Sequence, residues 1–382
     1  MSLKIRFPKC IIRFLTFIAY NLFYVLYMME CCTQTLYLAT LVLFCCMNLF
    51  CILVKGGRFK KSIREFKLGI GYVLVFFIIS VFVQVLHMDF EMYLVNGLVR
   101  IALPIINAFL FVNSVDEEDQ QCFFNVLLAR FVLHFVWENY NNFNLAGFSS
   151  ISWNDSSSDM ESSLAHDFII MEMYYLYKNS KKKALLCVLL CMLSMKRISF
   201  VLAPILYVIS NRVPKGVKVK NTALNIVKII VIISPFVILG MYTNTFQNWF
   251  NETFNVSLNT VMSGRPEIYR ILNNNIPYYN GYGSANNFLD NYVTIRYGTT
   301  WNTILHNDFL RIYLETTIRG IVVLANNLVN LTKKEYWHFL MICYLLLVAI
   351  TSHILNYFSV WITFYLVIMS YSDSSVKSLI NN

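Results

Sequence analysis

The sequence predicts an all-α polytopic membrane protein with about 12 transmembrane helices and one large extracytoplasmic loop. Hydrophobic residues make up 57% of the chain and charged residues only 14%, which is too apolar for a soluble domain of this length. The apolar residues fall into blocks of roughly 15–23, each about long enough to cross a ~30 Å hydrocarbon core. Because these blocks lack the alternation of a membrane β-barrel, they are expected to be helices.

The predicted spans divide around one long polar interval. They are 11–29, 35–54, 68–86, 94–112, 123–137, 163–177, 184–195, 198–210, 223–241, 309–331, 337–350 and 357–370. Residues 1–242 are expected to form an N-terminal bundle of about nine spans, 243–308 the large loop, and 309–382 the C-terminal helices and tail. The first span has basic flanks and no small-residue cleavage site after it, so a retained anchor is expected rather than a removed signal peptide.

The net charge of +10 is interpreted as a topology signal, because the cations gather on one side of the predicted spans. The termini and the loops after even-numbered spans hold 20 cations, against five on the other side. Lys and Arg mark the cytoplasmic side, so both termini are predicted to be cytoplasmic and the 243–308 loop to face outward. One inner loop, Asp116–Asp119, is acidic, but acidic residues contribute little to this rule. The distribution argues against a nucleic-acid partner.

Ionisable residues are also predicted within the spans. They are Arg100, Arg130, His134, His166, Asp167, Glu172, and a stripe of Arg311, Glu315 and Arg319 at helical spacing. Charges at the bilayer centre are costly, so these side chains should face other helices or a cavity. Interhelical pairing and a functional role both stay open at this point.

No metal or other cofactor is expected. The ten cysteines lie in or beside apolar spans and none lies in the large loop, so they are interpreted as core thiols. The carboxylates of the outer loop lack a paired spacing.

Three features converge on the predicted outer face. Arg197 lies at a helical turn, Arg265 lies early in the large loop, and His306-Asn307-Asp308 closes that loop. Guanidinium groups suit diphosphates because they are permanently charged and donate two hydrogen bonds as a fork. A histidine at the membrane rim can accept a hydroxyl proton near neutral pH. Between them, Gly281-Tyr282-Gly283 predicts a tight turn.

In order and spacing these motifs resemble the bacterial O-antigen and capsule repeat-unit polymerases of the Wzy type and the related O-antigen ligases. The matching pattern is Lys-Arg after an apolar run, Ser-Gly-Arg-x-x-Ile-Tyr, Gly-Tyr-Gly, and His-Asn-Asp-Phe-Leu-Arg-Ile-x-x-Glu-x-x-x-x-Gly, and it covers about Arg197 to Gly320. The chain departs from the pattern in two places. Lys196-Arg197-Ile198 replaces the usual neighbours of the first arginine, and Thr317 stands where the family often has glycine.

The resemblance implies a class-C glycosyltransferase-like fold and transfer of polyprenyl-diphosphate-linked glycans on the outer face of the bacterial plasma membrane. It implies that Arg197 and Arg265 bind the donor diphosphate and that His306 acts in catalysis, as the base in an inverting, metal-independent transfer. It leaves open whether a chain-length regulator binds.

Several further residues are candidates for substrate contact. Arg311 is expected to extend the anion subsite with Glu315 as its i,i+4 partner, although an interhelical ion pair of purely structural value explains the spacing nearly as well. Tyr282 is a candidate surface for stacking against sugars, as are Tyr278, Tyr279 and Trp301. Ordinary loop packing or interfacial anchoring would account for the same aromatic residues.

Two other functions compete with the polymerase. An O-antigen ligase of the same fold would use the same residues. A lipid-linked oligosaccharide flippase would also be basic, with about twelve spans and charges in them, but it would not need a long outer loop ending in a histidine motif.

Overall fold

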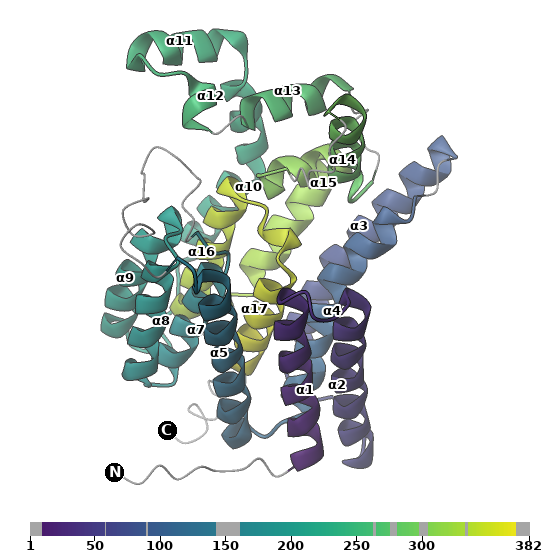
Figure 1. Cartoon of the computed structure of the whole chain (residues 1–382), viewed down its shortest axis with the longest axis vertical. Coiled ribbons are helices and arrows are strands. Elements are labelled where there is room, and N and C mark those ends of the chain that lie inside the picture. The colour runs from purple at the N-terminus through teal and green to yellow at the C-terminus, as the bar shows by residue number, and fades with distance from the viewer. Residues whose placement is uncertain are drawn as a thin grey trace.

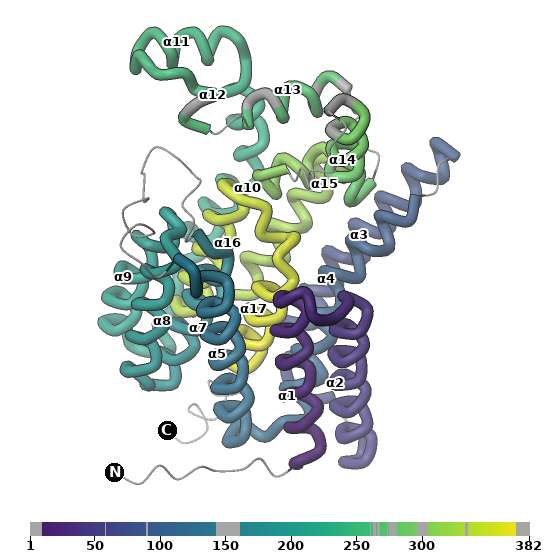
Figure 2. Tube along the Cα trace, in the orientation of Figure 1, coloured from purple at the N-terminus to yellow at the C-terminus, as the bar shows by residue number. Residues whose placement is uncertain are grey.

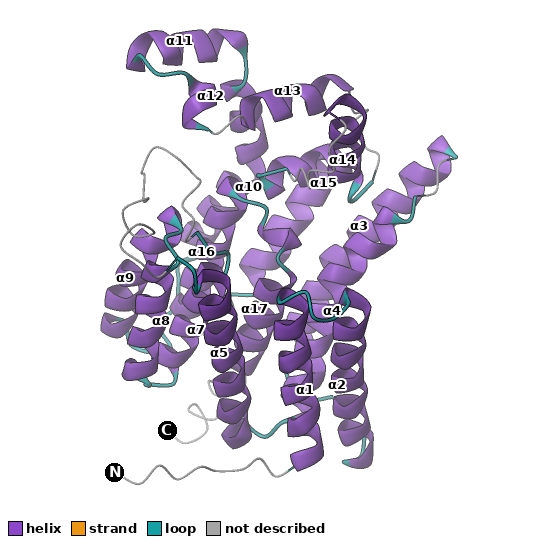
Figure 3. Cartoon of the chain, in the orientation of Figure 1, coloured by secondary structure: helices purple, strands orange, loops and turns teal. Residues whose placement is uncertain are grey.

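The described part of the chain is folded into helices. The computed structural model describes residues 10–57, 59–88, 91–142, 161–262, 265–275, 281–297, 305–332 and 335–371. Within these ranges there is no strand, as Figure 3 shows. One isolated antiparallel bridge pairs Lys218 with Glu335.

Most helices of the bundle run side by side, and α3 leans away from the others at one edge (Figure 1). The bundle helices are α1 (Ile11–Met28), α2 (Gln34–Val54), α3 (Ile63–His87), α4 (Tyr93–Ser114), α5 (Glu117–Asn139), α7 (Ala165–Tyr177), α8 (Lys181–Leu193), α9 (Arg197–Arg212), α10 (Asn221–Met241), α15 (Asp308–Asn330), α16 (Tyr336–Thr351) and α17 (Phe358–Tyr371), with the 3-10 turn η1 (Ile354–Asn356) before α17. Each predicted span therefore holds a helix whose ends lie within a few residues of the expected ones.

Five helices in the described part of the chain, α1, α2, α3, α4 and α10, are long and apolar enough to cross a membrane. The helical class and the membrane character are confirmed in this sense. The number of spans stays a prediction, because α7, α8, α9, α16 and α17 are shorter than 18 residues. The other two helices, α5 and α15, carry several charged residues.

The core of the bundle is built around α7 and α17. Every residue of α7 is buried, and so is every residue of α17 after Phe358. In Figure 2, α17 (yellow) lies inside the bundle, where it contacts α4 and α7. The outer helices instead expose large apolar side chains, such as Ile78 and Phe82 of α3. Exposed apolar surface on helices of this length suggests a lipid bilayer as the surroundings.

Most of the ionisable residues predicted within spans are buried, and Arg130 and Asp167 are joined between helices. Arg130 donates to Ser359 Oγ (2.7 Å), which lies 3.3 Å from Asp167 Oδ1, and its guanidinium lies 4.2 Å from the ring centroid of Tyr24. These contacts link α5, α7, α17 and α1, as expected for interhelical pairing. Arg100 differs from the prediction, because its side chain is exposed on α4.

Four short helices form a cap at one end of the bundle, beyond the ends of α10 and α15 (Figure 1). They are α11 (Asn244–Phe254), α12 (Leu258–Val261), α13 (Arg265–Asn275) and α14 (Ser284–Tyr297). The hydroxyl of Thr243 caps α11 by accepting from Phe246 N (3.3 Å), so the new helix starts directly after α10. The polar interval 243–308 is therefore largely helical where it is described.

A break in α15 lies at Thr317, whose φ of 67° and ψ of −177° belong to a region that glycine favours. In a regular helix the N–H of Arg319 would donate to the carbonyl of Glu315. Here it donates to Thr317 Oγ1 (3.2 Å), and Glu315 O accepts from Gly281 N (3.2 Å). The break thus releases one helix carbonyl, which holds the Gly281-Tyr282-Gly283 turn.

Gly320 follows this break closely, and replacing it by alanine should destabilise the fold. An added Cβ would overlap Thr316 Oγ1 and lie 2.7 Å from Thr316 Cβ. Such overpacking costs about 1–3 kcal/mol, which corresponds to a Tm lowered by roughly 2–5 °C. Gly240→Ala in α10 is the matched control, because nothing lies within 4 Å of its Cβ position. The Tm of both variants is measured by thermal unfolding in detergent. A Gly320→Ala protein as stable as the control would contradict the tight packing around Gly320.

Candidate functional site

The motif His306-Asn307-Asp308 forms the turn that starts α15. Asn307 caps the helix by accepting from Leu310 N (2.8 Å), and its amide donates to Ile350 O at the end of α16 (2.5 Å). Asp308 is fully buried and accepts from Leu355 N (2.8 Å). Two of the three motif residues therefore build the turn, and the third, His306, projects from it with partial exposure.

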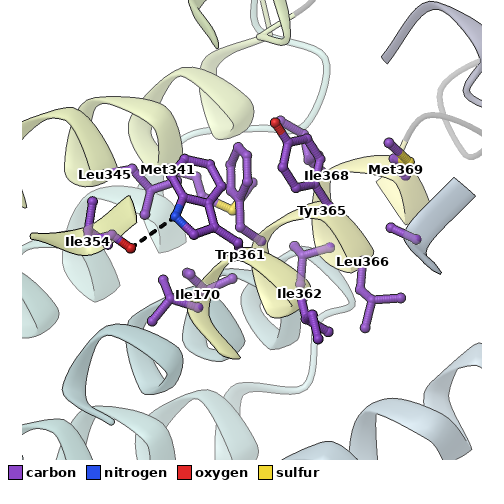
Figure 4. Close-up of a cluster of buried hydrophobic side chains, with 14 of the residues drawn as sticks. Ile170, Met341, Leu345, Ile354, Trp361, Ile362, Tyr365, Leu366, Ile368 and Met369 are labelled. Carbon is purple, nitrogen blue, oxygen red and sulfur yellow. Dashed lines mark hydrogen bonds between the residues drawn. The ribbon is translucent and has the colours of Figure 1, made fainter. Parts of the chain in front are cut away.

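The segment between α16 and α17 carries a second histidine, His353, that the sequence did not single out. This segment is held firmly. Trp361 of α17 donates from its indole to Ile354 O (2.9 Å), and its ring packs among Ile170, Met341 and Leu345 (Figure 4). Together with the bond from Leu355 N to Asp308, this anchor fixes the position of His353 beside the start of α15.

His306 and His353 form a direct pair. Their Nδ1 atoms lie 2.9 Å apart and their ring centroids 4.5 Å apart. Burial lowers the pKa of His306 to about 4, with further contributions from the charges of Arg265 and Lys196. Burial is also the main cause that lowers the pKa of His353, to about 3. The neighbouring groups His306, Arg311, Lys196 and Arg265 lower this pKa further. Both rings are therefore neutral near pH 7, and one of them donates the single proton that lies between the two nitrogens.

Two cations face this pair from different elements. Arg265 is the first residue of α13, and its guanidinium donates to Thr351 O at the end of α16 (3.1 Å). Lys196 precedes α9 and pairs with Glu161 (2.9 Å). Tyr269 of α13 donates from its hydroxyl to the carbonyl of His306. The site thus joins α9, α13, α15 and α16 at the end of the bundle that carries the cap.

Arg197 is exposed at the first residue of α9. The charge that acts on both histidines from this turn is that of Lys196. The left-handed backbone of Met195 (φ 49°) turns the chain immediately before these two residues. Consecutive side chains at a helix start point in different directions, so only one of the pair can face the histidines.

Arg311 is buried inside the first turn of α15, where protein groups surround its guanidinium. It donates to Asn356 Oδ1 (2.6 Å) and to the hydroxyl of Tyr282 (3.0 Å), and it lies 3.4 Å from Asp308 and 3.9 Å from Glu315. The i,i+4 pairing with Glu315 is as predicted. The surroundings favour the structural interpretation of Arg311 over an anion subsite.

The third member of the predicted stripe, Arg319, is exposed. The break at Thr317 separates it from Arg311 and Glu315, so the stripe ends at that break.

Tyr282 is also buried, at 3% exposure, and has no face available for a sugar. Its ring stacks on Phe76 of α3 (5.3 Å between centroids) and lies 5.3 Å from the guanidinium carbon of Arg311. Gly281 and Gly283 flank it at φ of 92° and 95°. A Cβ on Gly283 would come within 2.9 Å of the ring of Tyr93, so this turn requires glycine for both conformation and space.

The remaining aromatic candidates, Tyr278, Tyr279 and Trp301, lie outside the described residues, as do Ser263 and Gly264. A cavity of about 460 Å³ opens beside α13 and is lined by Tyr242, Tyr269, Arg270 and Asn274, among others. Tyr269 therefore contacts His306 and also lines this cavity. Among the described residues, no group of three or more His, Cys, Asp or Glu side chains is placed to hold a metal ion.

Comparison of the chain with protein-family models, with curated proteins and with solved structures finds no match.

Arg311→Ala should reduce the amount of folded protein, because two carboxylates would remain buried without a counter-charge. Removing one partner of a buried pair costs about 3–5 kcal/mol. Arg319→Ala is the matched control, since Arg319 is exposed on the same helix. Fluorescence-detected size exclusion of tagged variants measures folded protein. Normal accumulation of Arg311→Ala would show that the buried network does not depend on the guanidinium.

Acid should destabilise the protein through the histidine pair. The folded pKa values of about 4 and about 3 lie below the ordinary value of 6.5, so the unfolded chain binds more protons as the pH falls below 6.5. Stability is then lost between about pH 6.5 and the folded pKa values, pH 4 for His306 and pH 3 for His353, at up to ~1.4 kcal/mol per pH unit for each proton. Tm measured across this range should fall less in the double variant His306→Gln, His353→Gln. His87→Gln, at the exposed end of α3, should keep the wild-type slope.

Proposed function

We propose that this protein is a polymerase that joins polyprenyl-diphosphate-linked oligosaccharide repeat units into O-antigen or capsular polysaccharide. The observation that carries the proposal is the close pair of His306 and His353, whose pKa values are lowered by burial and by the charges of Arg265 and Lys196, at the end of a helical bundle that carries a polar cap. A neutral base beside fixed positive charges suits transfer from a diphosphate-linked donor.

The proposed reaction is a single displacement at the anomeric carbon. Nε2 of His306 accepts the proton of the acceptor hydroxyl as the oxygen of that hydroxyl bonds to the anomeric carbon of the donor sugar. The bond from this carbon to the diphosphate oxygen breaks with inversion, and the electron pair leaves with the diphosphate. The proton held by His306 then passes to the departing diphosphate or to solvent.

Arg265 and Lys196 stabilise the negative charge that develops on the leaving diphosphate. Preorganised charges of this kind contribute several kcal/mol in a site of low water content, roughly 2.7–4 for a single donor. The same cations lower the pKa of His306. A bound diphosphate would offset their charge and raise the basicity of His306 when substrate is present.

The cavity beside α13 offers a place for the sugars. Its volume of about 460 Å³ suits a small ligand, and its lining combines tyrosine, asparagine and arginine side chains that can hydrogen-bond hydroxyl groups. It adjoins His306 through Tyr269.

The finer topology belongs to the same proposal. The apolar runs predict about twelve spans, and the distribution of Lys and Arg predicts cytoplasmic termini and an outward-facing cap. The resemblance implies that the membrane is the bacterial plasma membrane. The cap in the structure, α11–α14, occupies the interval predicted to face outward.

Alanine variants of the two cations test the function. Arg265→Ala and Lys196→Ala should abolish the polymer ladder in cells while the proteins still accumulate in the membrane. Arg265→Lys should rescue poorly, because an ammonium does not reproduce the guanidinium fork. Arg197→Ala should retain the ladder, since its side chain is exposed and the charge at this turn that shifts the pKa of both histidines is that of Lys196. Electrophoresis of extracted glycolipid, with immunoblots for protein amount, gives the readout.

The pattern of products separates the alternatives. A polymerase defect leaves single repeat units attached to the finished lipid core. A ligase defect leaves polymer on the polyprenyl carrier, and a flippase defect leaves repeat units on the cytoplasmic leaflet. A normal ladder in both the Arg265 and Lys196 variants would overturn the proposed site.

A further inference from the structure

The geometry points to His353 as a positioning residue for His306. It accepts a hydrogen bond from the Nδ1–H of His306, which keeps Nε2 of His306 unprotonated and directed at the acceptor hydroxyl. This inference rests on the proposed function for its catalytic meaning, although the pairing itself can be tested without it.

The short distance between the two Nδ1 atoms means that only one of them carries a proton. Two neutral imidazoles whose Nδ1 atoms are 2.9 Å apart share one proton on that line. If His353 donates, His306 carries its own proton on Nε2 and cannot accept another there. If His306 donates, its Nε2 has a free lone pair and can serve as a base. The partner of a catalytic histidine thus decides which nitrogen does the chemistry.

His353 is built into the fold in a way that suits this role. Its side chain is 9% exposed and its ring packs on Tyr357 (4.7 Å between centroids). Trp361, Asp308 and Arg311 bind the three residues that follow it, through Ile354 O, Leu355 N and Asn356 Oδ1. These contacts hold the backbone after His353 and one face of its ring, so the position of its Nδ1 is well defined.

The charged groups around the pair favour a neutral partner at this position. Arg265 faces it from α13, Lys196 with Glu161 from the turn before α9, and Arg311 from α15. A second positive charge on His353 would be repelled by these cations. His353 therefore stays an acceptor when His306 takes up the proton of the acceptor hydroxyl.

Two substitutions separate hydrogen bonding from mere packing. His353→Asn places an amide oxygen close to the former Nδ1, so it can still accept from His306. His353→Leu fills the space without an acceptor. In purified protein supplied with a synthetic polyprenyl-diphosphate repeat unit, the Leu variant should lose about 100-fold or more in kcat with KM changed by less than about threefold. The Asn variant should recover to within about tenfold of wild type.

The pH profile adds a readout that packing alone would not move. Loss of the acceptor leaves the imidazolium of His306 without its partner, so the lower limb of the kcat profile should shift in the Leu variant and not in the Asn variant. A Leu variant that is folded and turns over at the wild-type rate would overturn the inference.

Nitrogen-15 NMR of histidine-labelled protein tests the pairing without any assay of transfer. The signal of His306, assigned by its loss in His306→Gln, should show a protonated Nδ1 and an unprotonated Nε2 in wild type and in His353→Asn. His353→Leu should shift it toward the Nε2–H form. Detection of Nε2–H in wild type would overturn the inference. The expected tautomers in a protein that transfers no glycan would instead refute the proposed function and leave the pairing intact.

Discussion

The buried guanidinium of Arg311 is the interaction on which the geometry of the site depends. It contacts four residues at once: Asp308 and Glu315 within α15, Tyr282 of the glycine-flanked turn, and Asn356 of η1. A planar group with five donors can satisfy such a set, whereas a lysine could not. Because Asp308 also binds the segment that carries His353, the same charge network aligns both histidines. Buried ion pairs contribute little net stability, and the best-supported use of this one is to specify a single arrangement.

The break in α15 explains how two sequence motifs act together. The carbonyl of Glu315, free of its helical partner, accepts from Gly281 N, and its carboxylate accepts from Ala285 N (3.1 Å). One residue thus holds both sides of the Gly281-Tyr282-Gly283 turn. This requires Thr317 to adopt a conformation that costs roughly 1–3 kcal/mol in a residue with a side chain. A glycine would adopt this conformation without that cost.

Helix positions could be predicted closely from the sequence, because apolar runs bounded by polar residues specify helices in lipid almost regardless of their packing. The spacing of Arg311 and Glu315 also predicted their pairing, since four residues make about one turn. The site itself was predicted only in part. His353 lies 47 residues after His306 and belongs to no recognisable motif, so only the packing of Trp361 and the contacts of Asp308 bring it close. Lys196 and Arg197 carry the same charge. Which of the two acts on the histidines depends on how the backbone turns at Met195, and the sequence does not specify that conformation.

The positions of His306 and the cations impose a condition on any substrate. Burial and the nearby positive charges both lower the pKa of the two histidines. Of these two causes, a ligand can change the effect of the positive charges. A neutral ligand would leave His306 a weak base, whereas a diphosphate beside Arg265 and Lys196 would strengthen it. Base and anion site are therefore coupled electrostatically, without any movement of the backbone. In the proposed transfer, such coupling would restrict proton removal to the complex that also contains the leaving group, so that no activated acceptor hydroxyl would form before a donor is bound.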